Sequence, residues 1–405
     1  MARNRIIYQS EGLYTGPTSG TSHTEVLDNS KGVATLQDAG APTRNGATPL
    51  QLHRIQSINY GFDIPRQDVN QFGQLARIDQ VILEQPTVDL DFTYYTETGF
   101  NDRQLGFHVG GRNTLGHFIS GEIGKVDSLI TVPGSNFYIR TSKEGDDLNR
   151  GTDLATDDII GIGNAFITNW STEASVGSFP TTSVTAEGLN MRFYTEGAGT
   201  VGANSNAHVP AVKPTDGANI TSNFKLPAAS EETDAAMPTA LKPGSIHFAG
   251  DILDDEKLWR GLKASDLKIQ SFSISADMSR ENLEKLGSRF AYSKELEFPL
   301  SVTLTMEAIC GSAFADNLAT IVGGTDNVYG VTIAIKDSPS AVYSDTDGTQ
   351  AIAYKLKGLK TDSLSFSSAI GDNKSVSLTA TAQIGAGDDT TNGLFIYAKG
   401  VKIAD

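Results

Sequence analysis

The sequence predicts a mainly β protein built from two tandem antiparallel β-sandwich or barrel domains, each with a short helix. Three observations favour this fold class. Apolar and polar residues alternate with a period of two in several segments, a group of segments recurs later in the chain, and a polar stretch lies between the two copies. We expect a first domain at 1–196, a linker or extended loop at 197–243 and a second domain at 244–405.

The repeat is found at two offsets. Residues 55–66 align with 269–280 at an offset of 269 − 55 = 214. A later block aligns 170–171 with 364–365, at an offset of 364 − 170 = 194. Identities that stay in phase over such lengths indicate a duplication. The difference, 214 − 194 = 20 residues, predicts an insertion in the first copy, which we place as an elongated loop in the glycine-rich stretch 106–125.

Strands are predicted where the alternation is clearest. In the first copy Ile58, Tyr60 and Phe62 alternate with polar residues, and so do the apolar residues of 88–94. In the second copy, residues 302–307 follow the same pattern. A period of two places all the apolar side chains of a strand on one face, so each strand is expected to have one covered and one open face.

A short helix is predicted in each copy, at 66–75 and at 280–286. Val69 and Phe72 repeat at helical spacing, and Gly73 follows them as a C-terminal cap, just as Gly287 follows Leu283 and Leu286 in the second copy. Aspartate is expected to cap the helix and arginine to lie along its first turn, the alternative being ion pairs between subunits. The repeated structural positions are Asp63, Arg66, Gly73, Asp277, Arg280 and Gly287.

Two long polar segments interrupt the β pattern. Residues 15–49 and 197–243 are rich in small and polar residues and cannot bury much surface. Long loops without structure of their own are uncommon in compact domains unless they have a function. We therefore expect both segments to contact a neighbouring subunit.

Composition excludes several classes of protein. The chain has 32 Lys and Arg and 48 Asp and Glu, which gives a net charge of 32 − 48 = −16. Such a charge disfavours tight binding of the protein to nucleic acid. The single cysteine, Cys310, excludes an internal disulfide. Neither a signal peptide nor an apolar run of 18 residues is found, so we expect no membrane partner and synthesis in a reducing cytoplasm.

No motif nominates a catalytic site, a metal site or a cofactor. The glycines at 161–163 begin like a dinucleotide fingerprint, but Phe166 stands where the third glycine belongs. The acidic residues of 147–158 are spaced somewhat like a calcium loop that lacks its turn glycine. We therefore predict that the protein is not an enzyme and needs no cofactor.

A set of matching segments occurs in both copies: 54–66, Gly73 and 86–92, with their echo at 268–280, 286–287, 298–299 and 302–304. These segments resemble the tail tube (major tail) proteins of tailed bacteriophages. The later stretch 166–186 is similar to the following strands of the same domain, and the matching blocks together cover a little over half of the chain.

The resemblance implies a structural virion protein that polymerises into stacked rings and forms a tail tube. Two fused domains imply a ring of three chains with pseudo-six-fold symmetry. The implied partners are other copies of the chain, a tape-measure protein and DNA that passes the lumen without sequence-specific binding. The implied location is the virion tail, assembled in the host cytoplasm. An acidic wall would let DNA slide, and Asp89 and Asp91 are the candidates for residues that face the lumen.

Two alternatives remain at this point. Another virion protein, such as a capsid decoration or tail-terminator subunit, would share the β domains without forming tubes. A carbohydrate-binding β-sandwich module would need exposed aromatic residues clustered on one face. Tyr94 and Tyr95 are the adjacent aromatic pair that stands out, and Tyr94 is expected on the covered face of its strand.

Overall fold

The computed structural model of the protein is mainly β, which confirms the predicted fold class. The division into two domains stays a prediction. The structure describes residues 11–17, 50–82, 87–96, 99–107, 109–110, 135–142, 158–194, 207–208, 223–224, 241–250, 257–259, 262–263, 267–284, 286, 293–310, 329–336, 350–368, 373–385 and 391–398.

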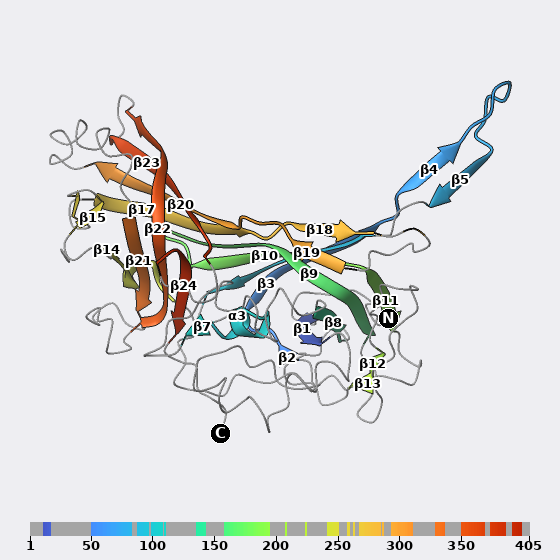
Figure 1. Cartoon of the computed structure of the whole chain (residues 1–405). Coiled ribbons are helices and arrows are strands. Elements are labelled where there is room, and N and C mark those ends of the chain that lie inside the picture. The colour runs from blue at the N-terminus through green and yellow to red at the C-terminus, as the bar shows by residue number, and fades with distance from the viewer. Residues whose placement is uncertain are drawn as a thin grey trace.

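A central antiparallel sheet crosses the molecule in the order β22-β23-β20-β17-β9-β10-β6-β3 (Figure 1). Every neighbouring pair in this path is antiparallel. The eight strands are β3 (Ile55–Asp63), β6 (Thr87–Tyr95), β9 (Asp158–Ser175), β10 (Thr181–Gly188), β17 (Leu267–Asp277), β20 (Ser301–Cys310), β22 (Gln350–Ser367) and β23 (Ser375–Gln383).

The two longest strands, β9 and β22, also build an outer layer with their first halves. The first half of β9 pairs with β8 and β11, and that of β22 pairs with β21 and β24. β1 and β2 extend the β8 side, whereas β14 and β7 extend the β21 and β24 side. The outer strands are β1 (Glu11–Pro17), β2 (Leu50–Gln51), β7 (Val109–Gly110), β8 (Ser135–Thr141), β11 (Asn190–Tyr194), β14 (Ile246–Gly250), β21 (Tyr329–Lys336) and β24 (Gly393–Ala398).

The hydrophobic core lies between the central sheet and this outer layer. Phe92 of β6 contacts Phe137 of β8, with ring centroids 5.8 Å apart. Trp170 lies in the half of β9 that belongs to the central sheet, and Tyr354 lies in the half of β22 that belongs to the outer layer. Their ring centroids are 6.0 Å apart. All four side chains are buried. One face of the central sheet is therefore covered by the chain itself.

Strand order and register recur in the two halves of the chain. The order β21-β22-β23-β20-β17 in the second half matches β8-β9-β10-β6-β3 in the first. The pairing Phe272↔Met306 lies 214 residues beyond Ile58↔Phe92 on both strands. A register shift interrupts each of these two strand pairs at a glutamine, Gln56 or Gln270. The offsets found in the sequence thus reappear as shared registers in the sheet.

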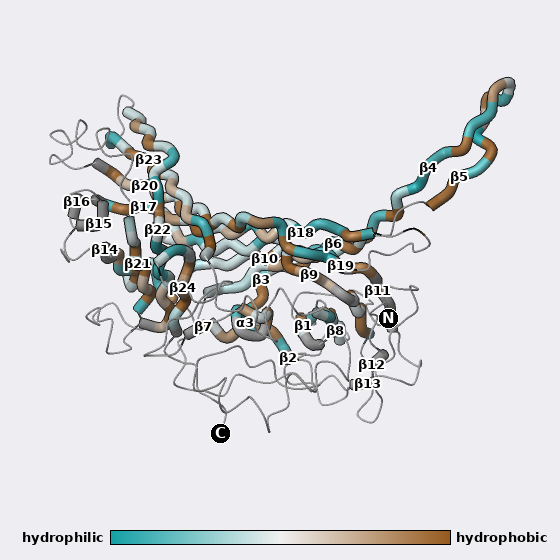
Figure 2. The backbone as a smooth tube through the Cα atoms, viewed as in Figure 1, coloured by the Kyte–Doolittle hydropathy of each residue, from teal (hydrophilic) through white to brown (hydrophobic). Residues whose placement is uncertain are grey.

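The helices predicted at 66–75 and 280–286 are wrong, because both segments form β-hairpins. The first hairpin joins β4 (Arg66–Val69) to β5 (Asp79–Ile82), and the second joins β18 (Arg280–Leu283) to β19 (Ser293–Leu296). Phe72 and Leu75 are fully exposed, so their spacing reflects no buried helix face. Among the described residues a short α-helix, α3 (Phe100–Gln104), lies elsewhere. The first hairpin extends away from the body of the molecule, with brown apolar stretches along it (Figures 1 and 2).

The repeated structural positions that the structure describes lie in the hairpins and in the turns that lead into them. The Oδ1 atom of Asp277 accepts hydrogen bonds from the backbone N–H (3.2 Å) and hydroxyl (2.9 Å) of Ser279, at the turn that leads into β18. Gly73 has φ = 87° in the turn of the first hairpin, where a side chain would be strained. Asp63 and Arg66 are exposed at the start of that hairpin, and Gly287 lies outside the described residues.

The predicted loops are described only in part. In the segment 106–125, Phe107 and Val109 are fully buried, so its start belongs to the core and not to an elongated loop. Residues 111–125, like 18–49, lie outside the described residues. In the predicted linker, β12 (Ala207–His208) pairs with β13 (Asn223–Phe224), and η5 (Pro243–Ser245) leads into β14. Another short pairing joins β15 (Lys257–Trp259) to β16 (Leu262–Lys263).

Candidate functional site: the polar face of the central sheet

One face of the central sheet is open and carries odd-numbered residues, except next to the bulge of β22, where Lys360 and Asp362 adjoin Thr381. Directly paired residues on antiparallel strands point to the same face, so the registers connect Asn59, Asp91, Thr185 and Asn169 in one row. The even-numbered neighbours point into the core, and Leu90, for example, is fully buried. Between the two end strands, the two faces of the sheet therefore differ in exposure.

We call this surface the polar face. It consists of the odd-numbered residues of the segments 57–63 (β3), 87–95 (β6), 169–175 (β9), 181–187 (β10), 271–277 (β17), 301–307 (β20), 363–367 (β22) and 375–383 (β23). Most of these residues are serine and threonine, and none within these segments is lysine or arginine. At the border of the face, the exposed Lys360 of β22 pairs with Thr381. The acidic residues among them are Asp63, Asp89, Asp91, Glu173, Glu187, Asp277 and Glu307.

Hydroxyl groups on the polar face bond to one another across the strands. The hydroxyls of Ser57 and Thr93 lie 2.7 Å apart, and those of Ser367 and Ser375 are also 2.7 Å apart. The hydroxyl of Ser271 donates to Oε2 of Glu307 at 3.2 Å. These bonds hold short side chains against the sheet, which leaves a smooth surface of neutral and negative groups.

Asp89 and Asp91 are exposed on the polar face, as their alternation with buried neighbours predicts. Asp89 lies opposite Gly61 and Glu187, and Asp91 lies opposite Asn59. Whether they face a lumen stays a prediction. Sequence reasoning did not place the other acidic residues on this face, although it named Asp63 and Asp277 as repeated positions, and it missed the serine-rich strands. A usable signal existed, because Ser271, Ser273 and Ser275 alternate with apolar residues just as clearly.

The second hairpin places two cations at the border of the polar face. The Lys294 ammonium lies 2.6 Å from Oε1 of Glu187, and the lysine side chain is only 4% exposed. The Arg280 guanidinium lies 4.9 Å from the centroid of the Phe166 ring and donates to the carbonyl of Lys294 at 3.2 Å. Burial lowers the pKa of Arg280 to about 10, against an opposing effect of Glu295. These contacts join the hairpin to β9 and β10 within one chain.

A buried carboxyl lies on the other side of the sheet. The Oδ1 atom of Asp102 in α3 accepts hydrogen bonds from the Tyr94 hydroxyl at 2.7 Å and from Nε1 of Trp170 at 3.0 Å. Burial raises the pKa of Asp102, although both hydrogen bonds act in the opposite direction. The group ties α3 to two strands of the central sheet from within the core.

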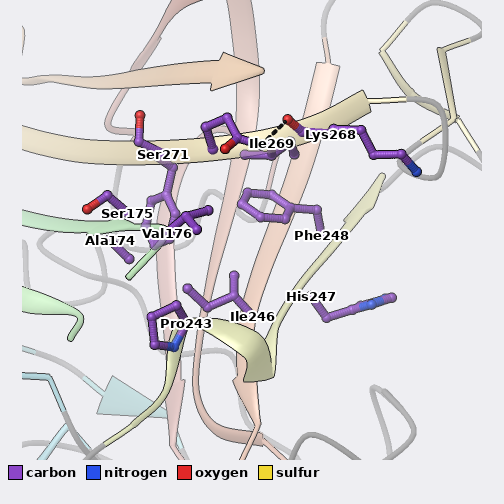
Figure 3. Close-up of a pocket in the computed structure, with 12 residues that line it drawn as sticks. Ala174, Ser175, Val176, Pro243, Ile246, His247, Phe248, Lys268, Ile269 and Ser271 are labelled. Carbon is purple, nitrogen blue, oxygen red and sulfur yellow. Dashed lines mark hydrogen bonds between the residues drawn. The ribbon is translucent and has the colours of Figure 1, made fainter. Parts of the chain in front are cut away.

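A pocket of about 580 Å³ lies beside the junction of β9 and β17 (Figure 3). Its wall is mainly apolar, and the rings of Phe248 and Phe272 meet edge to face at 5.7 Å. The side chains of His247 and Lys268 point away from the apolar cluster. Burial lowers the pKa of His247, and Lys336 lowers it further. The pocket thus offers apolar contact and no converging set of charged groups.

Within the described residues, no group of three His, Cys, Asp or Glu side chains could hold a metal ion. The helices in the same part of the chain are all too short or too polar to cross a membrane.

Comparisons with solved structures give weak likenesses, two of which are to chains of gene transfer agent particles. No family model matches the chain, and no curated protein matches it. A chain from the tail of an empty gene transfer agent particle with C6 symmetry aligns at 16% identity and a TM-score of 0.21, covering 31% of this chain and 84% of that one. A chain from the virion of the native gene transfer agent aligns at 15% identity and a TM-score of 0.19, covering 31% and 96%. With TM-scores this low, neither likeness supports the proposals below, which rest on the central sheet.

Proposed function

We propose that the protein is a structural subunit of a phage-type tail tube, in which chains close into rings, rings stack, and the polar face lines the lumen. The observation that carries this proposal is the polar face itself. A sheet of eight strands is covered on one side by the chain's own core, whereas its other side carries mainly hydroxyls and carboxylates, with Lys360 and Lys294 at its borders. Such a face is suited to enclosing a channel.

The chemistry of the face suits a conduit for DNA. Nucleic acid binds proteins mainly through lysine and arginine side chains that displace counterions from phosphates. A wall of carboxylates and serine hydroxyls repels phosphates and, apart from Lys360 at its border, offers no cation among the residues of the face to hold them. DNA would therefore pass such a wall without being retained, and the same smooth surface would accommodate a tape-measure protein before ejection.

The strand count agrees with a wide channel. A ring of three chains, each with two repeated units, would contain 3 × 8 = 24 central strands. With strands about 4.8 Å apart and tilted by about 40°, such a barrel is about 48 Å across at the backbone. Barrels of about 16–18 strands already enclose water-filled channels. The proposed ring therefore leaves an open lumen with pseudo-six-fold symmetry.

The proposal includes a location and a chemical role. The subunit would belong to the virion tail, would assemble in the host cytoplasm and would act without catalysis. Decoration and terminator proteins also form symmetric assemblies, but they do not stack into long tubes. Stacking is therefore the property to measure.

Electron microscopy of the purified chain tests the proposal. We expect hollow tubes or stacked rings in negative stain, and class averages with three-fold symmetry and a six-fold modulation. True six-fold rings of whole chains would contradict the trimer and leave the tube intact. Small closed oligomers that never stack would favour a decoration or terminator protein, and a monomer at all concentrations would overturn the proposal.

A further inference from the structure

The central sheet ends in two edges that can be compared with a junction inside the same sheet. β3 forms one end, where no described strand pairs with its outer side. At the other end, residues 360–367 of β22 pair with β23 on one side, and no described strand pairs with the other. Open edges of this kind are templates for pairing with another chain.

The internal junction is the pairing of β17 with β9. Its register runs from Ser271↔Ser175 to Asp277↔Asn169. β17 occupies the same place in the second half of the sheet as β3 does in the first, and β22 occupies the place of β9. The sheet therefore already contains one junction between the two kinds of edge that stand open at its ends.

The apolar side chains of β3 are more exposed than their counterparts on β17, as expected if β3 lacks a neighbouring strand. Ile274 and Ala276 of β17 are fully buried at the internal junction. Their counterparts on β3, 214 residues earlier, are Tyr60 and Phe62, which are 39% and 61% exposed. Two large apolar side chains are thus exposed at positions that the junction covers elsewhere in the same sheet.

The edge of β22 shows the same difference. Thr172 and Trp170 of β9 are buried at the internal junction. Their counterparts 194 residues later are Phe366, which is 36% exposed, and the half-buried Leu364. The ammonium of Lys374 lies 5.4 Å from the centroid of the Phe366 ring, so this ring already has one polar contact. Both ends of the sheet therefore carry apolar residues on the face that is otherwise core.

We propose that β3 of one copy of the chain pairs antiparallel with β22 of a second copy, in the register of the internal junction. Shifting Ile274↔Thr172 by the two offsets gives 274 − 214 = 60 opposite 172 + 194 = 366. Tyr60 then faces Phe366, Phe62 faces Leu364, and Gly61 faces Ser365. The inference rests on the proposed function and specifies the contact by which a ring closes.

The register keeps both faces of the sheet continuous across the contact. Even-numbered residues join core to core, whereas the odd-numbered residues extend the polar face. Asp63 would lie opposite Ser363, just as Asp277 lies opposite Asn169 within the chain. No pair of like charges is placed face to face, which would destabilise the pairing. A shift by one residue would instead move the apolar set of each edge onto the polar face.

Disulfide trapping between two single-cysteine chains tests the register. In a Cys310→Ser background, one chain carries Gly61→Cys and the other Ser365→Cys. Gly61 accepts the change, because a Cβ atom built there meets no atom within 4 Å. Under oxidised glutathione, we expect the mixture to give a covalent dimer in at least tenfold excess over either chain alone.

Two control pairs calibrate the crosslink. Ser275→Cys with Ser171→Cys in one chain reproduces the same position at the internal junction and should close within the chain. A mixture of Ser57→Cys and Ser365→Cys chains places the thiols on the same face but 61 − 57 = 4 residue pairs out of line, and it should give at most a tenth of the dimer.

A substitution series tests the edge independently. Phe62→Asp should reduce ring formation at least tenfold without lowering the melting temperature of the monomer, because this side chain is exposed before assembly. Phe193→Asp, on β11 and 59% exposed, is the matched control and should leave ring formation unchanged.

The outcomes separate this inference from the proposed function. If rings or tubes form and the internal control closes while the Gly61→Cys and Ser365→Cys mixture gives no dimer, the register is wrong and the tube survives. If the dimer forms while only open fibres are seen, the edge pairing holds and the ring is wrong. A monomer without any crosslink contradicts both.

Discussion

Asp102 is an ionisable residue buried in the hydrophobic core, where its charged form is disfavoured. It is 1% exposed, and its hydrogen bonds reach Tyr94, eight residues away in sequence, and Trp170, 68 residues away. Both partners donate to a single oxygen, so an amide oxygen could replace the carboxylate without breaking either bond. The raised pKa means that folding favours the protonated acid over the ionised one.

We expect Asp102→Asn to remove a pH-dependent loss of stability. Below the ordinary aspartate pKa the acid is protonated in both states and costs nothing. As pH rises through the raised pKa of the folded state, ionisation favours unfolding. The melting temperature of the native protein should therefore fall relative to the variant between acidic and neutral pH. Calorimetry over this range checks the sign, and a difference independent of pH would contradict it.

Alternation could predict single residues of the site only where local sequence determines exposure. Asp89 and Asp91 follow a strict period of two beside Val88, Leu90 and Phe92, so their open face could be predicted. The role of Asp102 could not, because its partners come from β6 and β9 and are brought together only by the folded sheet. Burial of a carboxyl depends on such distant contacts and leaves no local pattern.

The hairpins show the limit of periodicity at the level of elements. In the first hairpin, Val69, Phe72, Leu75 and Ile78 recur every three residues, yet all four are exposed. Such spacing indicates a helix only if the apolar residues share a covered face. The strands, by contrast, were predicted correctly where alternation continues over a whole element, as in β6 and β20.

We expect the contact between Lys294 and Glu187 to stabilise the docked hairpin measurably. A double-mutant cycle with Lys294→Met and Glu187→Gln should give a coupling of about 1–3 kcal/mol, because the lysine is almost fully buried. The matched pair Arg77 and Asp68, on the exposed first hairpin at 54% and 45% exposure, should give about 0–0.5 kcal/mol. Urea unfolding at neutral pH measures both, and equal couplings would show that burial of Lys294 does not matter.

At the scale of the whole molecule, the offsets of 214 and 194 in the sequence indicated a duplication, and strand pairs 214 residues apart share their register. The offsets could not predict that the second set of strands joins the first through β17 and β9. That pairing depends on two edges meeting in space, which a repeat in sequence does not encode. The polar face follows from the junction, because only the joined sheet makes its serine-rich strands one continuous surface.

We expect positive charge on the polar face to make the assembled protein bind DNA, which the native face would not retain. Asp89→Lys with Asp91→Lys changes the net charge from −16 to −16 + 4 = −12. Assembled variants should retain linear duplex DNA at low salt and release it as salt rises. The control, Asp68→Lys with Asp79→Lys on the first hairpin, changes the charge equally. Filter retention of labelled DNA compares the two, and equal retention would contradict a role for the polar face.

The junction between β17 and β9 also has a consequence for how assembly depends on concentration. In the proposed ring of six repeated units, three of the six contacts are made within chains and require no encounter between separate molecules. Each avoided association saves translational and rotational entropy of about 4–15 kcal/mol. Ring formation then scales with the third power of the chain concentration, where separate units would follow the sixth. Fusion of the units thus lets rings form from a far more dilute pool of subunits.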